Sequence, residues 1–94
     1  MAITIEEIKY TPDPMVAGGK VNATFKIKSD EEIASVKLYT PDYRTLEAKK
    51  AGDGIYTLES DVPYDAPSGT HDITLVVTDT KGDVTRKYGQ IKIG

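Results

Sequence analysis

The stretch GTHDITLVVTDTKGD, residues 69–83, carries the most regular pattern in this chain of 94 residues. Every second residue from 71 to 79 falls on one side of an extended backbone, and the apolar members of that side are Ile73, Leu75 and Val77. Alternation with a period of two, in a segment rich in β-branched residues, is typical of a half-buried β-strand. Residues 80–83 then predict a turn, because Gly82 can adopt a positive φ, and residues 84–93 should return as the second strand of a hairpin.

Similar alternation elsewhere in the chain predicts further strands. Residues 20–28 form the clearest of these, and residues 34–40 and 55–62 repeat the pattern between turn-forming clusters. The side chains expected to face inward are Val21, Ala23, Phe25, Ile27, Ala34, Val36, Leu38, Tyr56, Leu58 and Val62. About seven short strands, without a long amphipathic helix, predict an all-β, antiparallel two-sheet sandwich, with a small barrel as the structural alternative.

Three segments are less regular. Residues 3–10 change parity at Glu6 and Glu7, which predicts a bulge or a change of partner sheet and a first strand that is broken in two. Met15 and Val16 lie between a proline-rich stretch and two glycines, so they should form at most a short edge piece. Residues 43–50 fit either a strand or one turn of helix, and the pattern leaves both open.

Composition excludes several classes of function. A chain of 94 residues is long enough for one domain, residues 1–94, which we expect to be monomeric in isolation. The net charge of -3 offers no basic surface for nucleic acid, and the absence of cysteine excludes disulfides and thiolate metal sites. No apolar run approaches the roughly 20 residues of a membrane span, and the charged residues 1–10 do not resemble a signal peptide. If the protein is exported, we therefore expect this domain to be part of a longer chain.

Three quoted segments carry a resemblance to a known family. They are TPDPMVAGGKVNATFKIKSDEEIASVKLYTP (residues 11–41), GDGIYTLESDVP (52–63) and SGTHDITLVVTDTKGD (68–83). Together they resemble prokaryotic immunoglobulin-like modules of surface proteins, which are close to fibronectin type III in architecture. The Gly-x-Tyr motif at residues 54–56 and the Asp-x-x-Gly-Asp turn at residues 79–83 match, whereas His71 stands where a tyrosine would be expected. The resemblance implies an immunoglobulin-like sandwich that serves as a spacer, an adhesive module or an accessory domain of a larger enzyme.

The single histidine, His71, is interpreted as a structural residue. It shares parity with Ile73, so its ring should point toward the end of the core and bond to a backbone group. Asp72 faces the other side of the strand, so the two side chains cannot form a carboxylate-oriented imidazole with Ser68 nearby. No catalytic residue and no cofactor is predicted, and no transition-metal ligand spacing is visible.

Two kinds of surface site remain as hypotheses. Acidic residues in predicted loops could hold calcium at a joint between modules, although aspartate in a turn usually serves local hydrogen bonding. The calcium candidates are Asp13, Asp42 and Asp79, within a wider set of loop acids that includes Asp30, Glu31, Glu32 and Asp83. Asn22 begins an N-x-T sequon on the outer face of its strand and is a candidate glycan acceptor.

The six tyrosines could supply a binding face, because tyrosine combines a large contact area with a hydrogen-bonding hydroxyl. They are Tyr10, Tyr39, Tyr43, Tyr56, Tyr64 and Tyr88, of which Tyr39 should lie on the outer face of its sheet. The sequence therefore favours a non-catalytic structural, adhesive or spacer module of a larger cell-surface or secreted protein, in contact with neighbouring domains of its chain. The alternative is a carbohydrate- or protein-binding accessory module attached to an extracellular enzyme.

Overall fold

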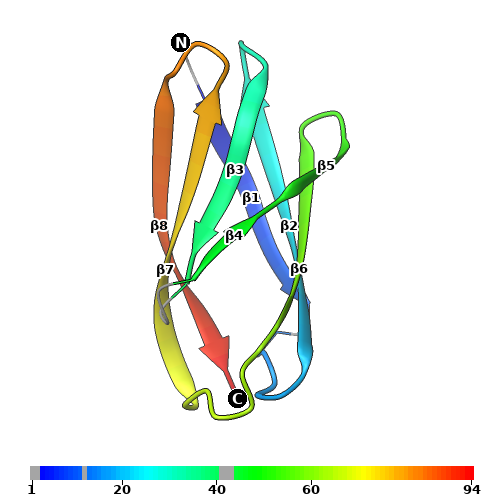
Figure 1. Cartoon of the computed structure of the whole chain (residues 1–94), viewed down its shortest axis with the longest axis vertical. Helices are drawn as coiled ribbons and strands as arrows, with labels where there is room; N and C mark the ends of the chain where they lie inside the picture. The colour runs from blue at the N-terminus through cyan, green and yellow to red at the C-terminus, as the bar shows by residue number, and fades with distance from the viewer. Residues whose placement is uncertain (1–2, 12, 41–43) are drawn as a thin grey trace.

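The structure is a computed structural model that describes residues 3–11, 13–40 and 44–94. These residues form two four-stranded antiparallel sheets that face each other (Figure 1). The first sheet contains, in spatial order, β1 (Ile3–Thr11), β2 (Lys20–Ser29), β6 (Ile55–Asp61) and β5 (Lys49–Gly52). The second contains β4 (Thr45–Glu47), β3 (Ile33–Tyr39), β7 (Gly69–Asp79) and β8 (Val84–Ile93). The predicted all-β sandwich is thus confirmed, and two separate sheets stand in place of the alternative barrel.

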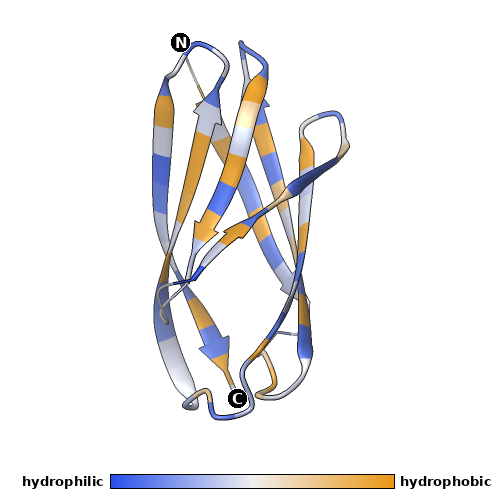
Figure 2. Ribbon diagram, viewed as in Figure 1, coloured by the Kyte–Doolittle hydropathy of each residue, from blue (hydrophilic) through white to orange (hydrophobic). Residues whose placement is uncertain are grey.

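The two sheets enclose the apolar faces that alternation predicted. Apolar and polar residues alternate along the strands (Figure 2), as a sandwich with one buried face per sheet requires. The larger core cluster consists of Ala23, Phe25, Ile27, Val36, Leu38, Tyr56, Ile73, Leu75 and Val77, with Leu58 packed against it. A smaller core cluster consists of Met15, Val62 and Ile93. The inward assignments on β2, β6 and β7 are therefore confirmed.

Bulges in β1 and β3 shift the parity of these strands. The register of β1 against β2 slips between Ile5 and Glu7, so the predicted bulge is confirmed. The expectation of a first strand broken in two is wrong, because β1 pairs with β2 on both sides of the slip. A second slip, between Ile33 and Ser35, separates Ala34 from the parity of Val36. Ile33 packs against the core and Ala34 is exposed, which corrects the prediction for Ala34.

In the segment left open as strand or helix, the described residues 44–50 are extended and change sheets. β4 pairs with β3 in the second sheet, and β5 pairs with β6 in the first. Between them, the Ala48 N–H donates to the carbonyl oxygen of Val36 at 2.8 Å. The chain then turns back into β6 at Gly54, whose φ is 71° and where a Cβ would approach the Ile27 carbonyl oxygen to 2.8 Å. The glycine of the Gly-x-Tyr motif is therefore required by both conformation and space.

The sandwich is elongated, with extents of 40 × 22 × 17 Å. β1 begins at one end of the long axis, which we call the N-terminal end, and β8 finishes at the opposite, C-terminal end (Figure 1). The β7–β8 turn lies at the N-terminal end, and the connection between β6 and β7 lies at the C-terminal end. Within the described ranges there is no helix that is long and apolar enough to cross a membrane.

Candidate functional site

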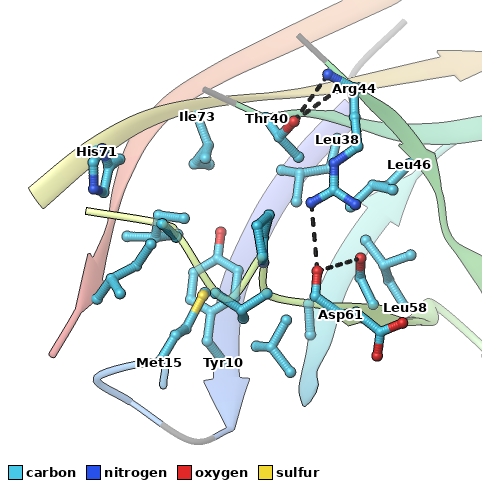
Figure 3. Close-up of a pocket in the computed structure, with 18 of the residues that line it drawn as sticks. Tyr10, Met15, Leu38, Thr40, Arg44, Leu46, Leu58, Asp61, His71 and Ile73 are labelled. Carbon is cyan, nitrogen blue, oxygen red and sulfur yellow. Dashed lines mark hydrogen bonds between the residues drawn. The ribbon is translucent and has the colours of Figure 1, made fainter. Parts of the chain in front are cut away.

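An apolar pocket of about 560 Å³ lies between the sheets, toward the C-terminal end. Its walls come from both core clusters, including Leu38 and Ile73 of the larger one and Met15 of the smaller one (Figure 3). Tyr10 and Ile91 pack against both clusters and also line the pocket. The pocket therefore separates the two parts of the core, and its walls offer mainly hydrophobic contact.

Polar groups gather on one side of this pocket (Figure 3). The Thr40 hydroxyl accepts a hydrogen bond from the Arg44 backbone N–H at 3.0 Å. The Arg44 guanidinium donates through Nη2 to the backbone carbonyl oxygen of Asp61 at 3.4 Å. Because Arg44 precedes β4 and Asp61 ends β6, this contact joins the two sheets beside the pocket.

Tyr10 places a phenol within the apolar interior. Its hydroxyl oxygen is buried and has no hydrogen-bond partner in the described part of the chain. Burial, and to a smaller extent the negative charge of Asp13, raises the pKa of Tyr10 to about 12. The hydroxyl therefore keeps its proton at neutral pH and is unsuited to act as a base.

His71 is half-buried at the edge of the pocket, as its parity predicted. Its Nε2 lies 2.8 Å from the Pro67 carbonyl oxygen, and because a carbonyl can only accept, Nε2 donates its hydrogen. Asp72 lies on the opposite face of β7, where its Oδ1 accepts a hydrogen bond from Gln90 Nε2 at 3.2 Å. The predicted backbone contact of His71 is confirmed, and His71 and Asp72 are held by different partners.

Of the three calcium candidates, the two that the structure describes, Asp13 and Asp79, are not brought together. Asp13 follows β1 at the C-terminal end, Asp79 finishes β7 at the N-terminal end, and Asp42 lies outside the described residues. Asp79 is only 2% exposed, and its Oδ1 accepts hydrogen bonds from the backbone N–H groups of Lys81 at 2.9 Å and Asp83 at 3.0 Å. Among the described residues, no three His, Cys, Asp or Glu side chains gather as a metal site would require. The carboxylate of Asp79 organises the β7–β8 turn.

The candidate glycan acceptor, Asn22, lies on β2 between β1 and β6. It is opposite Thr11 on one side and Glu59 on the other, and its side chain is exposed as predicted. The structure places it on the outer face of the first sheet, and its glycosylation stays a prediction.

Two tyrosines form a row that the sequence did not reveal. Tyr39 on β3 is opposite Thr74 on β7, and Thr74 is opposite Tyr88 on β8. Because residues directly opposite each other share a face, both tyrosines lie on the outer face of the second sheet. Of the other tyrosines, Tyr10 and Tyr56 belong to the interior, Tyr64 is exposed after β6, and Tyr43 lies outside the described residues. The sequence did not reveal this row because the row depends on the pairing register of β3, β7 and β8.

The chain is similar to several solved structures, whereas no family model and no curated protein matches its sequence. The fibronectin(III)-like modules of CbhA from Clostridium thermocellum align over 98% of this chain and 94% of theirs, with 18% identity and a TM-score of 0.63. The soluble domain of PmoD from Methylocystis aligns over 98% and 90%, with 15% identity and a TM-score of 0.61. The PKD1 domain of Epp from Vibrio anguillarum aligns over 100% and 98%, with 18% identity and a TM-score of 0.57.

The strand order agrees with these similarities. The first sheet has the neighbour relations of strands A, B, E and D of an immunoglobulin domain, and in the second sheet β3, β7 and β8 have those of strands C, F and G. The edge strand β4 is added beside β3. The fold of this chain is therefore an immunoglobulin-like β-sandwich, of the form seen in fibronectin(III)-like modules and PKD domains.

Proposed function

We propose that this chain is a non-catalytic structural module of a larger cell-surface or secreted protein, in which it holds its neighbours apart. The observation that carries the proposal is the placement of β1 and β8, which begin and finish at opposite ends of a 40 Å axis (Figure 1). Segments joined to the two ends would be separated by the length of the sandwich. Two of the similar structures, the fibronectin(III)-like modules of CbhA and the PKD1 domain of Epp, are described as modules and as a domain, which supports a modular role for this chain.

The attachment of the last strand supports a role in linking. The Met15 N–H donates to the Lys92 carbonyl oxygen at 2.7 Å, and the Gly94 N–H donates to the Met15 carbonyl oxygen at 2.8 Å. Met15 and Ile93 are both buried in the smaller core cluster. Backbone bonds and apolar contacts therefore attach the end of β8 to the body of the sandwich.

The edges of the first sheet also suit an isolated unit. β5 is an edge strand and carries the exposed Lys49 and Lys50, and the sequence that follows β1, at the other edge, has proline at positions 12 and 14. Lysine and proline at sheet edges discourage pairing with strands of other molecules. These features support a module that keeps its own fold beside similar neighbours.

A tandem protein with two copies of the chain tests the structural role. We expect small-angle X-ray scattering to show a maximum dimension that exceeds that of a single copy by about the 40 Å length of one module. Each copy should also unfold at the urea midpoint of the single copy, because the ends carry no shared core. A tandem that is no longer than one copy, with its copies packed side by side, would contradict the proposal.

A second candidate function is that of a binding module attached to an extracellular enzyme. The specific observation in its favour is the exposed pair Tyr39 and Tyr88 on the outer face of the second sheet. Binding through these side chains would distinguish this function from that of a plain spacer, since the length of the module is the same in both.

A further inference from the structure

The outer face of the second sheet carries a symmetric set of six residues. Tyr39, Thr74 and Tyr88 lie opposite one another on β3, β7 and β8. The next row on the same face consists of Lys37, Val76 and Arg86 on the same three strands. Each flanking strand thus presents one tyrosine and one cation, two residues apart, and the central strand presents two short β-branched side chains. We call these six residues the tyrosine–cation surface.

The two rings are far enough apart to contact an extended ligand at two places. β3 and β8 are separated by β7, and two strand spacings amount to roughly 10 Å. Tyr88 is 75% exposed and Tyr39 is 42% exposed, while the intervening Thr74 is too short to hide either ring. A chain-like ligand that crosses the strands can therefore meet Tyr39 and Tyr88 at the same time.

The second row has a buried residue at its centre. Val76 belongs to the outward-facing parity of β7, yet it is only 8% exposed. Neighbouring side chains must cover it, and the residues directly opposite are Lys37 and Arg86. Aliphatic stems that rest on an apolar residue have less rotational freedom to lose when their charged ends bind a ligand.

The charge of this surface differs from that of the chain. The net charge is -3, but Lys37 and Arg86 place two cations beside the tyrosines. The ion pairs found among the described residues join Lys9 to Glu7 and Lys20 to Glu59, and involve neither of these cations. Two carboxylates share this face: that of Asp72 is hydrogen-bonded to Gln90, and that of Glu47 on β4 lies opposite Lys37, with no ion pair between them among the described residues. A ligand that brings negative charge to Lys37 and Arg86 would be complementary.

We propose that the tyrosine–cation surface binds an acidic polysaccharide. Sugar rings lie against the aromatic faces of Tyr39 and Tyr88, since the C–H face of a sugar is apolar and the positive edge of its C–H bonds suits the negative face of an aromatic ring. Carboxylates of the sugar units pair with Lys37 and Arg86, and the Thr74 hydroxyl lies between the rings, within the footprint of a polar ligand. This inference deepens the second candidate function and does not depend on the structural role.

Affinity gel electrophoresis with two matched polymers tests the proposal. Polygalacturonate carries one carboxylate per sugar, and its fully methyl-esterified form has the same backbone without the charge. We expect the wild-type protein to be retarded more by polygalacturonate, and less as salt is added, because screening weakens the ionic contacts. Y39A and Y88A should each weaken retardation by both polymers about three- to tenfold. K37Q and R86Q should weaken retardation by polygalacturonate alone.

Tyr64→Ala is the matched control, because Tyr64 is 87% exposed and lies in the connection between β6 and β7, at the C-terminal end of the molecule. It should leave both retardations unchanged. Amide chemical-shift changes on addition of polygalacturonate fragments should be confined to residues 35–39, 72–78 and 84–90. No retardation by either polymer, equal retardation by both, or an equal loss in the Tyr64→Ala protein would each overturn the proposal. None of these results would alter the length of a tandem protein, so the structural role is judged separately.

Discussion

Tyr10 shows how a single atom can lower the stability of a sandwich. Its ring contributes to both core clusters, but its buried hydroxyl gives up water without gaining a partner in the described part of the chain. An unsatisfied polar group in an apolar interior is unfavourable, and the ring alone supplies the hydrophobic contact. We expect Tyr10→Phe to leave the free energy of unfolding at pH 7 unchanged or to raise it by up to about 1 kcal/mol, as measured by urea denaturation.

Measurements at alkaline pH test whether burial of the Tyr10 hydroxyl is the cause of this difference in stability. The pKa of Tyr10 is raised from 10.0 to about 12 in the folded state, so below pH 10 the phenol is neutral in both states and its ionisation does not affect the free energy of unfolding. As the pH rises from 10 toward 12, the unfolded state releases the proton more readily than the folded state, and the free energy of unfolding falls. The phenylalanine variant has no hydroxyl and does not lose this stability. The advantage of Tyr10→Phe should therefore grow over this interval, whereas Tyr88→Phe, at an exposed position, should follow the wild type. A Tyr10→Phe protein that is clearly less stable at pH 7 would show that the hydroxyl has a partner.

At the scale of elements, the β7–β8 hairpin depends on one carboxylate. Oδ1 of Asp79 accepts two backbone N–H groups in the turn, and the Asp79 N–H donates to the Asp83 carbonyl oxygen at 3.0 Å. Asp79→Ala removes the acceptor, and we expect it to lower the free energy of unfolding by about 1 to 3 kcal/mol. Asp79→Asn keeps an acceptor in the same place and should cost less. Urea denaturation of both variants measures the difference.

Asp83→Ala is the control for this hairpin, since Asp83 contributes backbone groups to the turn and its side chain is exposed. It should stay within about 0.5 kcal/mol of the wild type, as surface substitutions usually do. If Asp79→Ala were equally mild, water would be replacing the carboxylate, and the turn would be held by Gly82 and the strand pairing instead.

The same scale shows what could be predicted from the sequence. Alternation fixes which side of β2, β6 and β7 faces inward, because each of these strands keeps its parity over its apolar residues. It fails at Ala34, since a bulge that inserts one residue exchanges the two faces and leaves no mark in the local pattern. Residues 43–50 stayed open for a related reason. Their direction is set by the two sheets that they connect, which are distant in sequence.

The candidate sites required information that no single strand contains. Tyr39 was predicted to face outward, but its row with Tyr88 exists only because β3 and β8 pair with the same residue of β7. The calcium candidates illustrate the converse. Asp13 and Asp79 both precede or follow turn signals, and only the direction of the intervening strands places them at opposite ends.

At the scale of the whole molecule, the core is divided along its length. The larger cluster fills the space between the central strands, and the smaller cluster closes the C-terminal end, with the apolar pocket between them. Only Tyr10 and Ile91 pack against both clusters among the described side chains. Opening the smaller cluster would break few contacts, so it should cost less free energy than unfolding the whole sandwich.

Native-state hydrogen exchange measured by NMR tests this division. The amides of Leu75 and Val77 lie in a strand that is paired on both sides, and they should exchange only through global unfolding. The Met15 and Gly94 amides donate the two bonds of an isolated bridge, and they should exchange at least about tenfold faster, through local opening. Met15→Ala should speed exchange at Gly94 by a larger factor than at Leu75, because it empties the smaller cluster first. Equal protection at both ends would mean that the pocket does not divide the core and that the sandwich opens as one unit.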